Sequence, residues 1–205
     1  MNFLLDVDGC IVDNGKCFKE YVQSYLKKYN MPHEIVNPNG YYASDIFGVK
    51  VDINHVAVDD SFVDFYIAEP MRNACEVIKE LKNMGHTIII LTSRKPELEI
   101  PVTQKMRDMF NIPHDDRFTN SAELTVLYLK YYDIPFDKVV FREDKDLYAA
   151  GIANAIAVDD MSYNLQAYLN MDIRCVAFDA PHNINCNTER ITDWKELLEL
   201  PGVRN

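Results

Sequence analysis

Short apolar segments alternate with amphipathic ones along most of the chain, and this alternation predicts an α/β fold. Segments of strand length are mainly apolar, and polar or turn-forming residues bound them, which is typical of buried strands. They are residues 2–5, 87–91, 138–141, 155–158 and 174–178. Because strands buried on both faces are characteristic of parallel sheets, the pattern favours a mostly parallel sheet with helices on both faces.

Apolar residues at helical spacing fill most of the intervals between these strands. Pro70 and Gly85 suit the start and the end of one helix, and Asp193 with Glu196 suits the cap of the last one. The predicted helices are residues 16–30, 70–84, 102–110, a stretch that begins at Asn120, and residues 146–152, 163–169 and 194–200. In such folds, ligands bind beyond the carboxyl ends of the strands.

Residues 31–65 depart from this order. The segment contains Pro32, Pro38, an Asn39-Gly40 pair and several aromatic residues, and it has no sustained period. We expect short elements and loops there rather than another layer of the regular fold.

Composition and charge narrow the class of protein. The chain has 205 residues, of which 48% are hydrophobic and 26% are charged, so it is expected to fold as one domain or as one domain with an insertion. Lys and Arg total 21 and Asp and Glu total 32, which gives a net charge of −11. This balance argues against a binder of polymeric nucleic acid, because phosphate backbones are held by clustered cations. A small anion could still bind with the help of a metal ion or a few well-placed cations.

Membrane and disulfide signals are weak in this sequence. The longest apolar runs are strand-sized, far below the roughly 20 residues that cross a bilayer, so no membrane span and no membrane partner are expected. The N-terminal residues lack a basic region and do not resemble a signal peptide. The number of cysteines is odd, and no Cys-x-x-Cys pair occurs among Cys10, Cys17, Cys75, Cys175 and Cys186. Neither a disulfide framework nor a zinc site is indicated, and we expect a cytoplasmic protein.

Residues with chemical potential follow the predicted strands directly. They are Asp6, Asp8 and Gly9 after the first strand, Thr92, Ser93 and Arg94 after the second, and Asp159 and Asp160 after the strand of residues 155–158. Lys145 begins the helix that precedes this last pair, whereas the rival Lys138 begins a strand and is expected to face solvent. Carboxylates that converge on one site repel each other unless a cation lies among them, and their oxygens suit Mg²⁺. Each signal alone has a structural explanation as a turn, a helix cap or a surface lysine, but their conjunction favours a functional site.

The four signals resemble the motifs of the haloacid dehalogenase (HAD) superfamily in their order and spacing. The segments that carry the resemblance are DVDG from Asp6, IIILTSR with Thr92, Lys145, and AVDDMSYN with Asp159, Asp160 and Asn164. Two softer signals, CVAFDAPHN at residues 175–183 and RITDWKEL at residues 190–197, resemble the 5′(3′)-deoxyribonucleotidase-like branch.

The resemblance implies an architecture and a set of roles. It implies a Rossmann-like core of residues 1–13 and 70–205 and a small helical cap of residues 14–69 inserted after the first strand. Asp6 would be the nucleophile that becomes phosphorylated, and Asp8 would be the general acid and base. Relatives with other chemistry commonly lack the second aspartate, so Asp8 favours phosphoryl transfer over dehalogenation. Lys145 would offset negative charge on the nucleophile and the phosphate.

The remaining roles concern the metal and the substrate. Mg²⁺ would be held by Asp6, the main-chain carbonyl of Asp8 and one of the pair Asp159 and Asp160. Asp160 is preferred as the direct ligand because Asn164 stands four residues after it, with Asp159 orienting a water or Lys145, although the sequence leaves these two roles open. The expected phosphate and substrate contacts are Asp8, Gly9, Thr92, Ser93, Arg94, Lys145 and, from the aromatic cluster of the cap, Tyr42 and Phe47. A salt bridge within the fold is nearly as good an explanation for Arg94, and for any single aromatic residue a place in the core of the cap is the better explanation.

These inferences lead to a functional hypothesis with alternatives. We expect a Mg²⁺-dependent phosphomonoester hydrolase that acts on a small phosphorylated substrate, with nucleoside monophosphates favoured. A sugar-phosphate phosphatase or a phosphomutase on the same scaffold is the main alternative. A receiver-like protein and a non-catalytic phosphate-binding protein rank lower, because the acidic pair follows the first strand and no motif residue is missing. Oligomeric state and the preference for base, sugar and 5′ or 3′ phosphate are not predicted.

Overall fold

The structure is a computed structural model that describes residues 1–52, 56, 59 and 63–204, with Lys16 and Cys17 described by their backbone. The chain forms two compact units, each described here by itself. The first unit comprises Met1–Val12, Pro70–Arg94 and Tyr132–Asn205, and the second comprises Asp13–Glu69 and Lys95–Tyr131. The second unit contains the predicted cap segment, residues 14–69, together with residues 95–131. The assignment of residues 14–69 as a cap stays a prediction.

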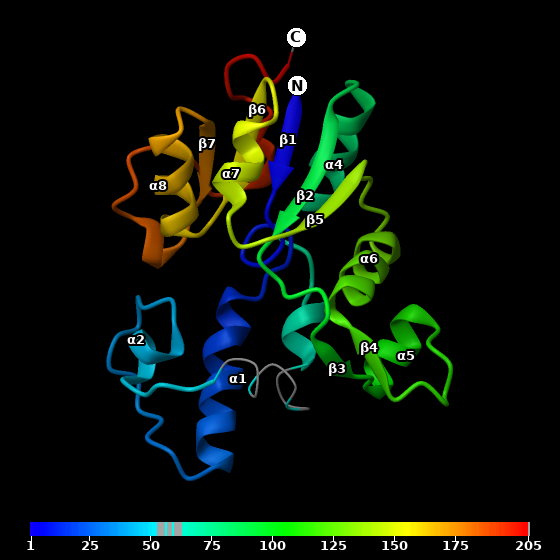
Figure 1. Ribbon diagram of the computed structural model, residues 1–205, viewed down its shortest axis with the longest axis vertical. Helices are drawn as coiled ribbons and strands as arrows, with labels where there is room; N and C mark the ends of the chain where they lie inside the picture. The colour runs from blue at the N-terminus through cyan, green and yellow to red at the C-terminus, as the bar shows by residue number, and fades with distance from the viewer. Residues whose placement is uncertain (53–55, 57–58, 60–62, 205) are drawn as a thin grey trace. The chain divides into compact units, whose positions relative to one another are not determined.

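A six-stranded sheet forms the centre of the first unit (Figure 1). All of its pairings are parallel, in the order β5-β2-β1-β6-β7-β8. The strands are β1 (Asn2–Leu5), β2 (Thr87–Thr92), β5 (Lys138–Phe141), β6 (Ala155–Asp159), β7 (Arg174–Phe178) and β8 (Glu189–Ile191). The five predicted strands and their parallel arrangement are confirmed, and the short edge strand β8 is an addition.

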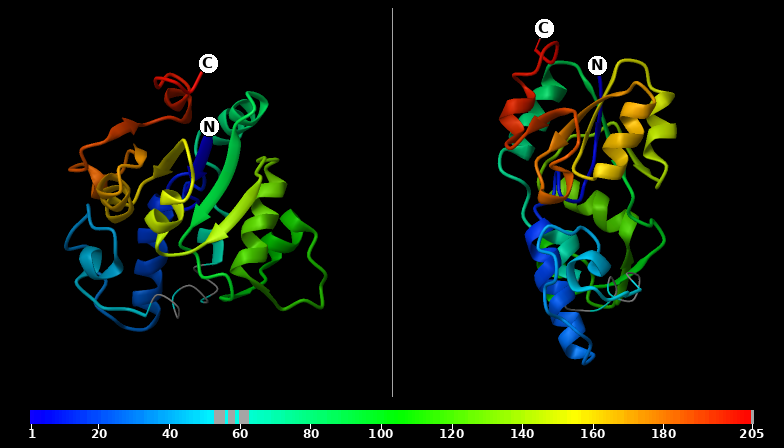
Figure 2. Two further views of the ribbon diagram at one scale, coloured as in Figure 1. Left: turned by 45° about the horizontal axis from the view of Figure 1, so that its top comes forward. Right: turned by 90° about the vertical axis from the view of Figure 1, so that its left-hand side faces the viewer.

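Helices cover both faces of this sheet. One face carries α7 (Lys145–Ala150) and α8 (Ser162–Asn170), and the other carries α4 (Ala74–Asn83) and α9 (Trp194–Leu197), as the side view of Figure 2 shows. The core between the sheet and α7 and α8 is apolar and includes Leu4, Ile89, Ala157, Leu165 and Tyr168. The predicted α/β fold with helices on both faces is therefore confirmed.

One predicted helix start is wrong. Pro70 was expected to open a helix, but α4 begins at Ala74, and Pro70 instead forms an antiparallel bridge with Val12. The neighbouring Met71 N–H donates to the carbonyl of Ile11 at 2.8 Å. This pairing with the segment after β1 uses extended backbone, so the helix starts only beyond it.

The second unit is mainly helical. Its elements are α1 (Gly15–Lys28), α2 (Ala43–Phe47), the 3₁₀ helix η1 (Val63–Ile67), α5 (Gln104–Phe110), α6 (Ser121–Tyr131) and the antiparallel pair β3 (Glu99–Pro101) and β4 (Phe118–Asn120). The long helix α1 packs against α2 and η1, and α6 also packs against η1, where the Tyr128 hydroxyl donates to the carbonyl of Ala68 at 2.9 Å. In the described part of residues 31–65 the helices are short, as predicted. The β3–β4 pair was not predicted from the sequence.

Among the residues that the structure describes, no helix is both long enough and apolar enough to span a membrane.

Candidate active site

The sheet register brings the predicted site residues to one edge. Leu5, the last residue of β1, is paired with Ile90 of β2 and with Val158 of β6. Asp6 continues from Leu5, and its N–H donates to the carbonyl of Val158 at 3.0 Å. Because all three strands run in parallel, their carboxyl ends deliver Asp6, Thr92 and Asp159 to the same region.

A buried lysine ties two of the carboxylates together. Nζ of Lys145, at the start of α7, lies 2.7 Å from Oδ1 of Asp6 and 2.9 Å from Oδ2 of Asp159, and its side chain is 1% exposed. Burial alone would lower the pKa of Lys145, but the attraction of Asp159 and Asp6 outweighs it, so the pKa is raised. Lys145 is therefore charged at neutral pH. The rival Lys138 is exposed at the start of β5.

Asp6 is a buried acid surrounded by other charged side chains. Burial raises its pKa well above the ordinary value, Lys145 lowers it, and repulsion from Asp159, Asp160 and Asp8 raises it further. The net effect is a carboxyl group whose charged form is costly without a further cation.

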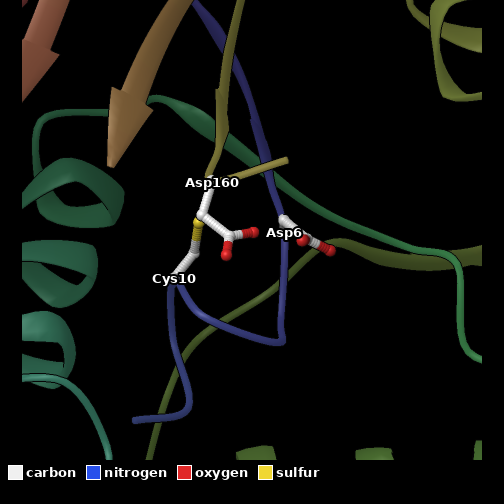
Figure 3. A group of neighbouring side chains, drawn as sticks. All are labelled: Asp6, Cys10 and Asp160. Atoms are coloured by element: carbon white, nitrogen blue, oxygen red, sulfur yellow. The ribbon is translucent and has the colours of Figure 1, made fainter. Parts of the chain in front are cut away.

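The two neighbouring aspartates at the end of β6 have different surroundings. Both carboxylate oxygens of Asp159 are engaged, because Nδ2 of Asn164 lies 3.1 Å from each of them and the N–H of Met161 donates to Oδ1 at 2.9 Å. Asn164 therefore binds the Asp159 carboxylate, although its position four residues after Asp160 had suggested a link with Asp160. Asp160 instead lies with Asp6 and Cys10, with ligand atoms of the three residues within 4.8 Å of one another (Figure 3).

The oxygens of this cluster fit a hard divalent cation. Asp6, Cys10 and Asp160 are all buried, and the two carboxylates offer the oxygen ligands that Mg²⁺ prefers. The thiol of Cys10 is a poor ligand for Mg²⁺, and burial raises its pKa well above the ordinary value, as do Asp160 and Asp6. As a possible metal ligand, therefore, Asp160 lies with Asp6, whereas Asp159 shares Lys145 with Asp6.

Glycine is required in the turn that carries these acids. Gly9 has φ +78°, and a Cβ built on it would lie 2.2 Å from Oδ2 of Asp160. The main chain of Gly9 therefore lies against the Asp160 carboxylate, where a side chain has no room.

Asp8 is held by a nearly buried arginine. Nε of Arg94 donates to Oδ2 of Asp8 at 2.9 Å and Nη2 donates to Oδ1 at 2.6 Å. The side chain of Arg94 is 3% exposed and that of Asp8 is 24% exposed. This two-pronged ion pair is the salt bridge within the fold that the sequence analysis weighed against a phosphate contact for Arg94.

The other predicted substrate contacts are distributed unevenly. Thr92 is fully buried and its Oγ1 accepts a hydrogen bond from the N–H of Arg94 at 3.2 Å, whereas Ser93 is exposed. Tyr42 and Phe47 belong to the second unit, where Phe47 is buried in α2 and Tyr42 is exposed just before it. Their contact with a substrate stays a prediction.

Cys10 was not predicted as a residue of the site. Cys10 was considered for disulfides and zinc alone, although its place four residues after Asp6 in the same turn was a usable signal. Nε2 of His182 lies 3.2 Å from Oδ2 of Asp160. Position alone could not reveal this contact, because it depends on the path of the chain after β7.

Comparison with known proteins identifies the fold. No protein-family model and no curated protein matches the sequence. Among solved structures, a haloacid dehalogenase-like hydrolase from Streptococcus pneumoniae is similar, with a TM-score of 0.58, 15% identity, and coverage of 97% of this chain and 96% of that chain. A protein described as a predicted phosphatase from Clostridium acetobutylicum has a TM-score of 0.57 and 17% identity, with coverage of 97% and 98%.

The same fold occurs in proteins with a different reaction. A structure described as a dehalogenase has a TM-score of 0.57 and 11% identity, with coverage of 97% of this chain and 95% of that chain. The chain therefore has the fold of HAD-like hydrolases. At such identities the similarity shows the fold alone, and the reaction has to be argued from the site.

Proposed function

We propose that the protein is a phosphatase of the HAD superfamily that hydrolyses a small phosphomonoester through a phosphorylated Asp6. The observation that carries the proposal is the arrangement around Asp6. A buried Lys145 lies 2.7 Å from this carboxylate, and a second carboxylate, Asp8, stands two residues on and is fixed by Arg94. This is a nucleophile, a cation and an acid–base group at one strand end.

Asp8 separates this proposal from dehalogenation. Displacing a halide needs no proton, because the halide leaves as a stable anion. An alkoxide leaving from phosphorus does need one, and a positioned carboxylic acid can supply it. The ion pair with Arg94 holds Asp8 in a defined orientation, which supports a role for this side chain in the reaction.

The proposed reaction proceeds in two displacements. A carboxylate oxygen of Asp6 attacks phosphorus, the ester P–O bond breaks, and the leaving oxygen takes a proton from Asp8. The Asp8 carboxylate then removes a proton from water, the water oxygen attacks phosphorus, and the bond to Asp6 breaks, which restores Asp6 and releases phosphate. Lys145 and the hydroxyl of Thr92 would stabilise negative charge on the transferring group.

Mg²⁺ is the proposed cofactor. Asp6 and Asp160, together with the main-chain carbonyl of Asp8, would hold it, and Asp159 would hold Lys145 in place. When bound, Mg²⁺ would neutralise part of the acidic charge and of the phosphate. The raised pKa of Asp6 supports this assignment, since a cation beside Asp6 would lower it.

The proposed substrate class is the nucleoside monophosphates. Its support is the resemblance of residues 175–183 and 190–197 to the deoxyribonucleotidase-like branch, and the exposed aromatic residue Tyr42 in the inserted segment. We propose that this segment, residues 14–69, is the cap that selects the substrate.

The first test compares phosphate release by the wild type with release by a variant that lacks the proposed nucleophile. With Mg²⁺, the wild type should release phosphate from p-nitrophenyl phosphate, and Asp6→Asn should lose at least about 1,000-fold in kcat because the amide cannot become phosphorylated. Asp115→Asn, at an exposed site in the second unit, is the matched control and should keep wild-type turnover. Unchanged turnover in Asp6→Asn would contradict the mechanism.

A substrate panel tests the finer proposal. Nucleoside 5′- and 3′-monophosphates are compared with sugar phosphates and with a 2-haloacid, by release of phosphate or halide. Nucleotide turnover well above that of sugar phosphates supports the proposed class. Equal, poor rates on all nucleotides favour the sugar-phosphate alternative, transfer of phosphate to a second sugar favours a mutase, and halide release favours a dehalogenase.

A further inference from the structure

The two C-terminal segments that resemble the nucleotidase-like branch form one connected group in the structure. Asp179, His182 and Asn183 come from the first segment, and Arg190 comes from the second. We refer to these four residues as the C-terminal bracket. They follow β7 or lie on β8, and they meet next to Asp160 at the end of β6.

Arg190 closes the bracket. Its Nη1 lies 2.8 Å from Oδ1 of Asp179 and donates to Oδ1 of Asn183 at 2.6 Å, and its Nη2 donates to the main-chain carbonyl of Asn183 at 2.8 Å. The N–H of Asp179 also donates to the carbonyl of Ile191 at 2.8 Å. One guanidinium thus fixes both ends of the short loop between Asp179 and Asn183, for which its planar fork is well suited.

Asn183 links this loop to the main chain of Asp160 by a hydrogen bond. It is fully buried, and its Nδ2 donates to the carbonyl of Asp160 at 2.6 Å and to the carbonyl of Phe178 at 2.8 Å. Its Oδ1 accepts from the N–H of Ala180 at 3.2 Å in addition to Arg190. The carboxyl ends of β6 and β7 are therefore bridged by a single amide side chain.

The ring of His182 lies beside the carboxylate of Asp160. Nε2 of the ring lies 3.2 Å from Oδ2 of Asp160, and the ring is 16% exposed. The same oxygen lies against the main chain of Gly9, where a Cβ would approach to 2.2 Å. The Asp160 carboxylate is thus confined by the ring on one side and by Gly9 on another.

We propose that His182 is a positioning residue, which orients the Asp160 carboxylate for the divalent cation, and that the rest of the bracket holds the imidazole in place. Partners behind a metal ligand fix its orientation, and their loss typically weakens metal binding about 10- to 100-fold. The inference rests on the metal site of the proposed function. It assigns the two branch-like segments a common role in setting the affinity for the cation.

The test measures cation binding without substrate, so that it does not depend on turnover. Free Mn²⁺ is measured by electron paramagnetic resonance during titration of the protein, and Mg²⁺ is used to compete for the site. The dissociation constant of the His182→Ala variant should be about 10-fold higher than that of the wild type or more. His182→Gln, which can place an amide N–H near Asp160, should recover part of the loss.

Controls separate positioning from a general loss of structure. His114→Ala, at an exposed site in the second unit, should bind Mn²⁺ like the wild type. The His182 variants should unfold at a temperature close to that of the wild type. In kinetics, His182→Ala should need more Mg²⁺ for half-maximal activity while its kcat at saturating Mg²⁺ stays near the wild-type value.

Arg190→Lys provides a second arm that leaves the ring in place. A lysine cannot reach Asp179 and both acceptors of Asn183 at once, so the loop should loosen and Mn²⁺ binding should weaken. This arm also carries the test if His182→Ala does not fold.

The outcomes distinguish the inference from the proposed function. Wild-type Mn²⁺ affinity in both His182→Ala and Arg190→Lys would overturn the positioning role while leaving the metal site intact. Absence of Mn²⁺ binding to the wild type, or unchanged binding in Asp160→Asn, would overturn the proposed metal site itself.

Discussion

At the scale of single residues, the pairing of Arg94 with Asp8 connects geometry to chemistry most directly. The guanidinium contacts both oxygens of Asp8, the proposed acid–base group, at 2.9 and 2.6 Å. Arginine can hold a carboxylate in this two-pronged manner, whereas lysine can offer only a point charge. If Asp8 protonates the leaving group, a change at Arg94 should matter most when that group is a poor one.

The corresponding prediction uses two substrates that differ in leaving group. Arg94→Lys should lower kcat/KM for an alkyl phosphate by about 100-fold or more, because general acid catalysis typically contributes 10²–10⁴-fold. The loss for p-nitrophenyl phosphate, whose phenolate leaves without a proton, should be much smaller. Arg72→Lys, at a side chain that is 88% exposed, is the control. Equal losses on both substrates would mean that Arg94 supports the fold or the phosphate rather than Asp8.

The site was predictable from the sequence to the level of position, but not of pairing. The order of motifs and the strand ends placed Asp6, Lys145 and Asp160 in one region. The hydrogen-bond partners of Arg94 and Asn164 could not be predicted. Each partner depends on the side-chain rotamer and on the path of the loop opposite it. Asn164 illustrates this, since the residue four positions before it in sequence is not the carboxylate that it binds.

At the scale of elements, the sequence predicted what burial on both faces enforces. The central strands are mainly apolar, and a hydrogen-bonded parallel sheet is the arrangement that buries them, so their positions could be predicted from the sequence. Strand β8 (Glu189–Ile191) has three residues at the edge of the sheet, too few to show a period. The start of α4 was misplaced because Pro70, a good first helical residue, is equally compatible with the extended bridge to Val12.

The turn from Asp6 to Val12 is the element on which the site depends most, and Gly9 tests it. Gly9→Ala should destabilise the fold by about 1–3 kcal/mol, since an L-residue at φ +78° is strained and its Cβ would meet the Asp160 carboxylate. Mn²⁺ affinity should fall as well. Gly15→Ala, where nothing lies within 4 Å of the added Cβ, is the matched control and should leave stability in urea unchanged or slightly raised. Wild-type stability of Gly9→Ala would show that the turn is not fixed in this form.

At the scale of the whole molecule, the buried acids of the site contribute to the net charge of −11. Asp6, Asp159 and Asp160 lie buried at one end of the sheet, and the ammonium of Lys145 pairs with Asp6 and Asp159. Buried like charges of this kind cost stability, and proteins often accept that cost at functional sites. Without a metal ion, the protein should therefore be less stable than a variant that lacks one of these buried charges.

The pKa of Asp6 gives this cost a sign. Because burial raises the pKa of Asp6 well above 3.8, the folded state binds its proton more tightly than the unfolded state does. The contribution of Asp6 to stability is therefore greatest at low pH, and it is lost as the pH rises from about the unfolded value of 3.8 through the higher folded value. Asp6→Asn, which cannot ionise, should be free of this loss.

Thermal unfolding of the metal-free protein tests this expectation. At neutral pH, Asp6→Asn should unfold at a higher temperature than the wild type, and the difference should shrink as the pH falls toward 4. Added Mg²⁺ should raise the unfolding temperature of the wild type, because an ion that binds the folded state alone stabilises it, and should raise that of Asp6→Asn much less. The exposed-site variant Asp115→Asn should follow the wild type throughout. A metal-free Asp6→Asn that is less stable than the wild type at neutral pH would show instead that the ion pair with Lys145 outweighs burial and repulsion, so that Asp6 stabilises the fold rather than destabilising it.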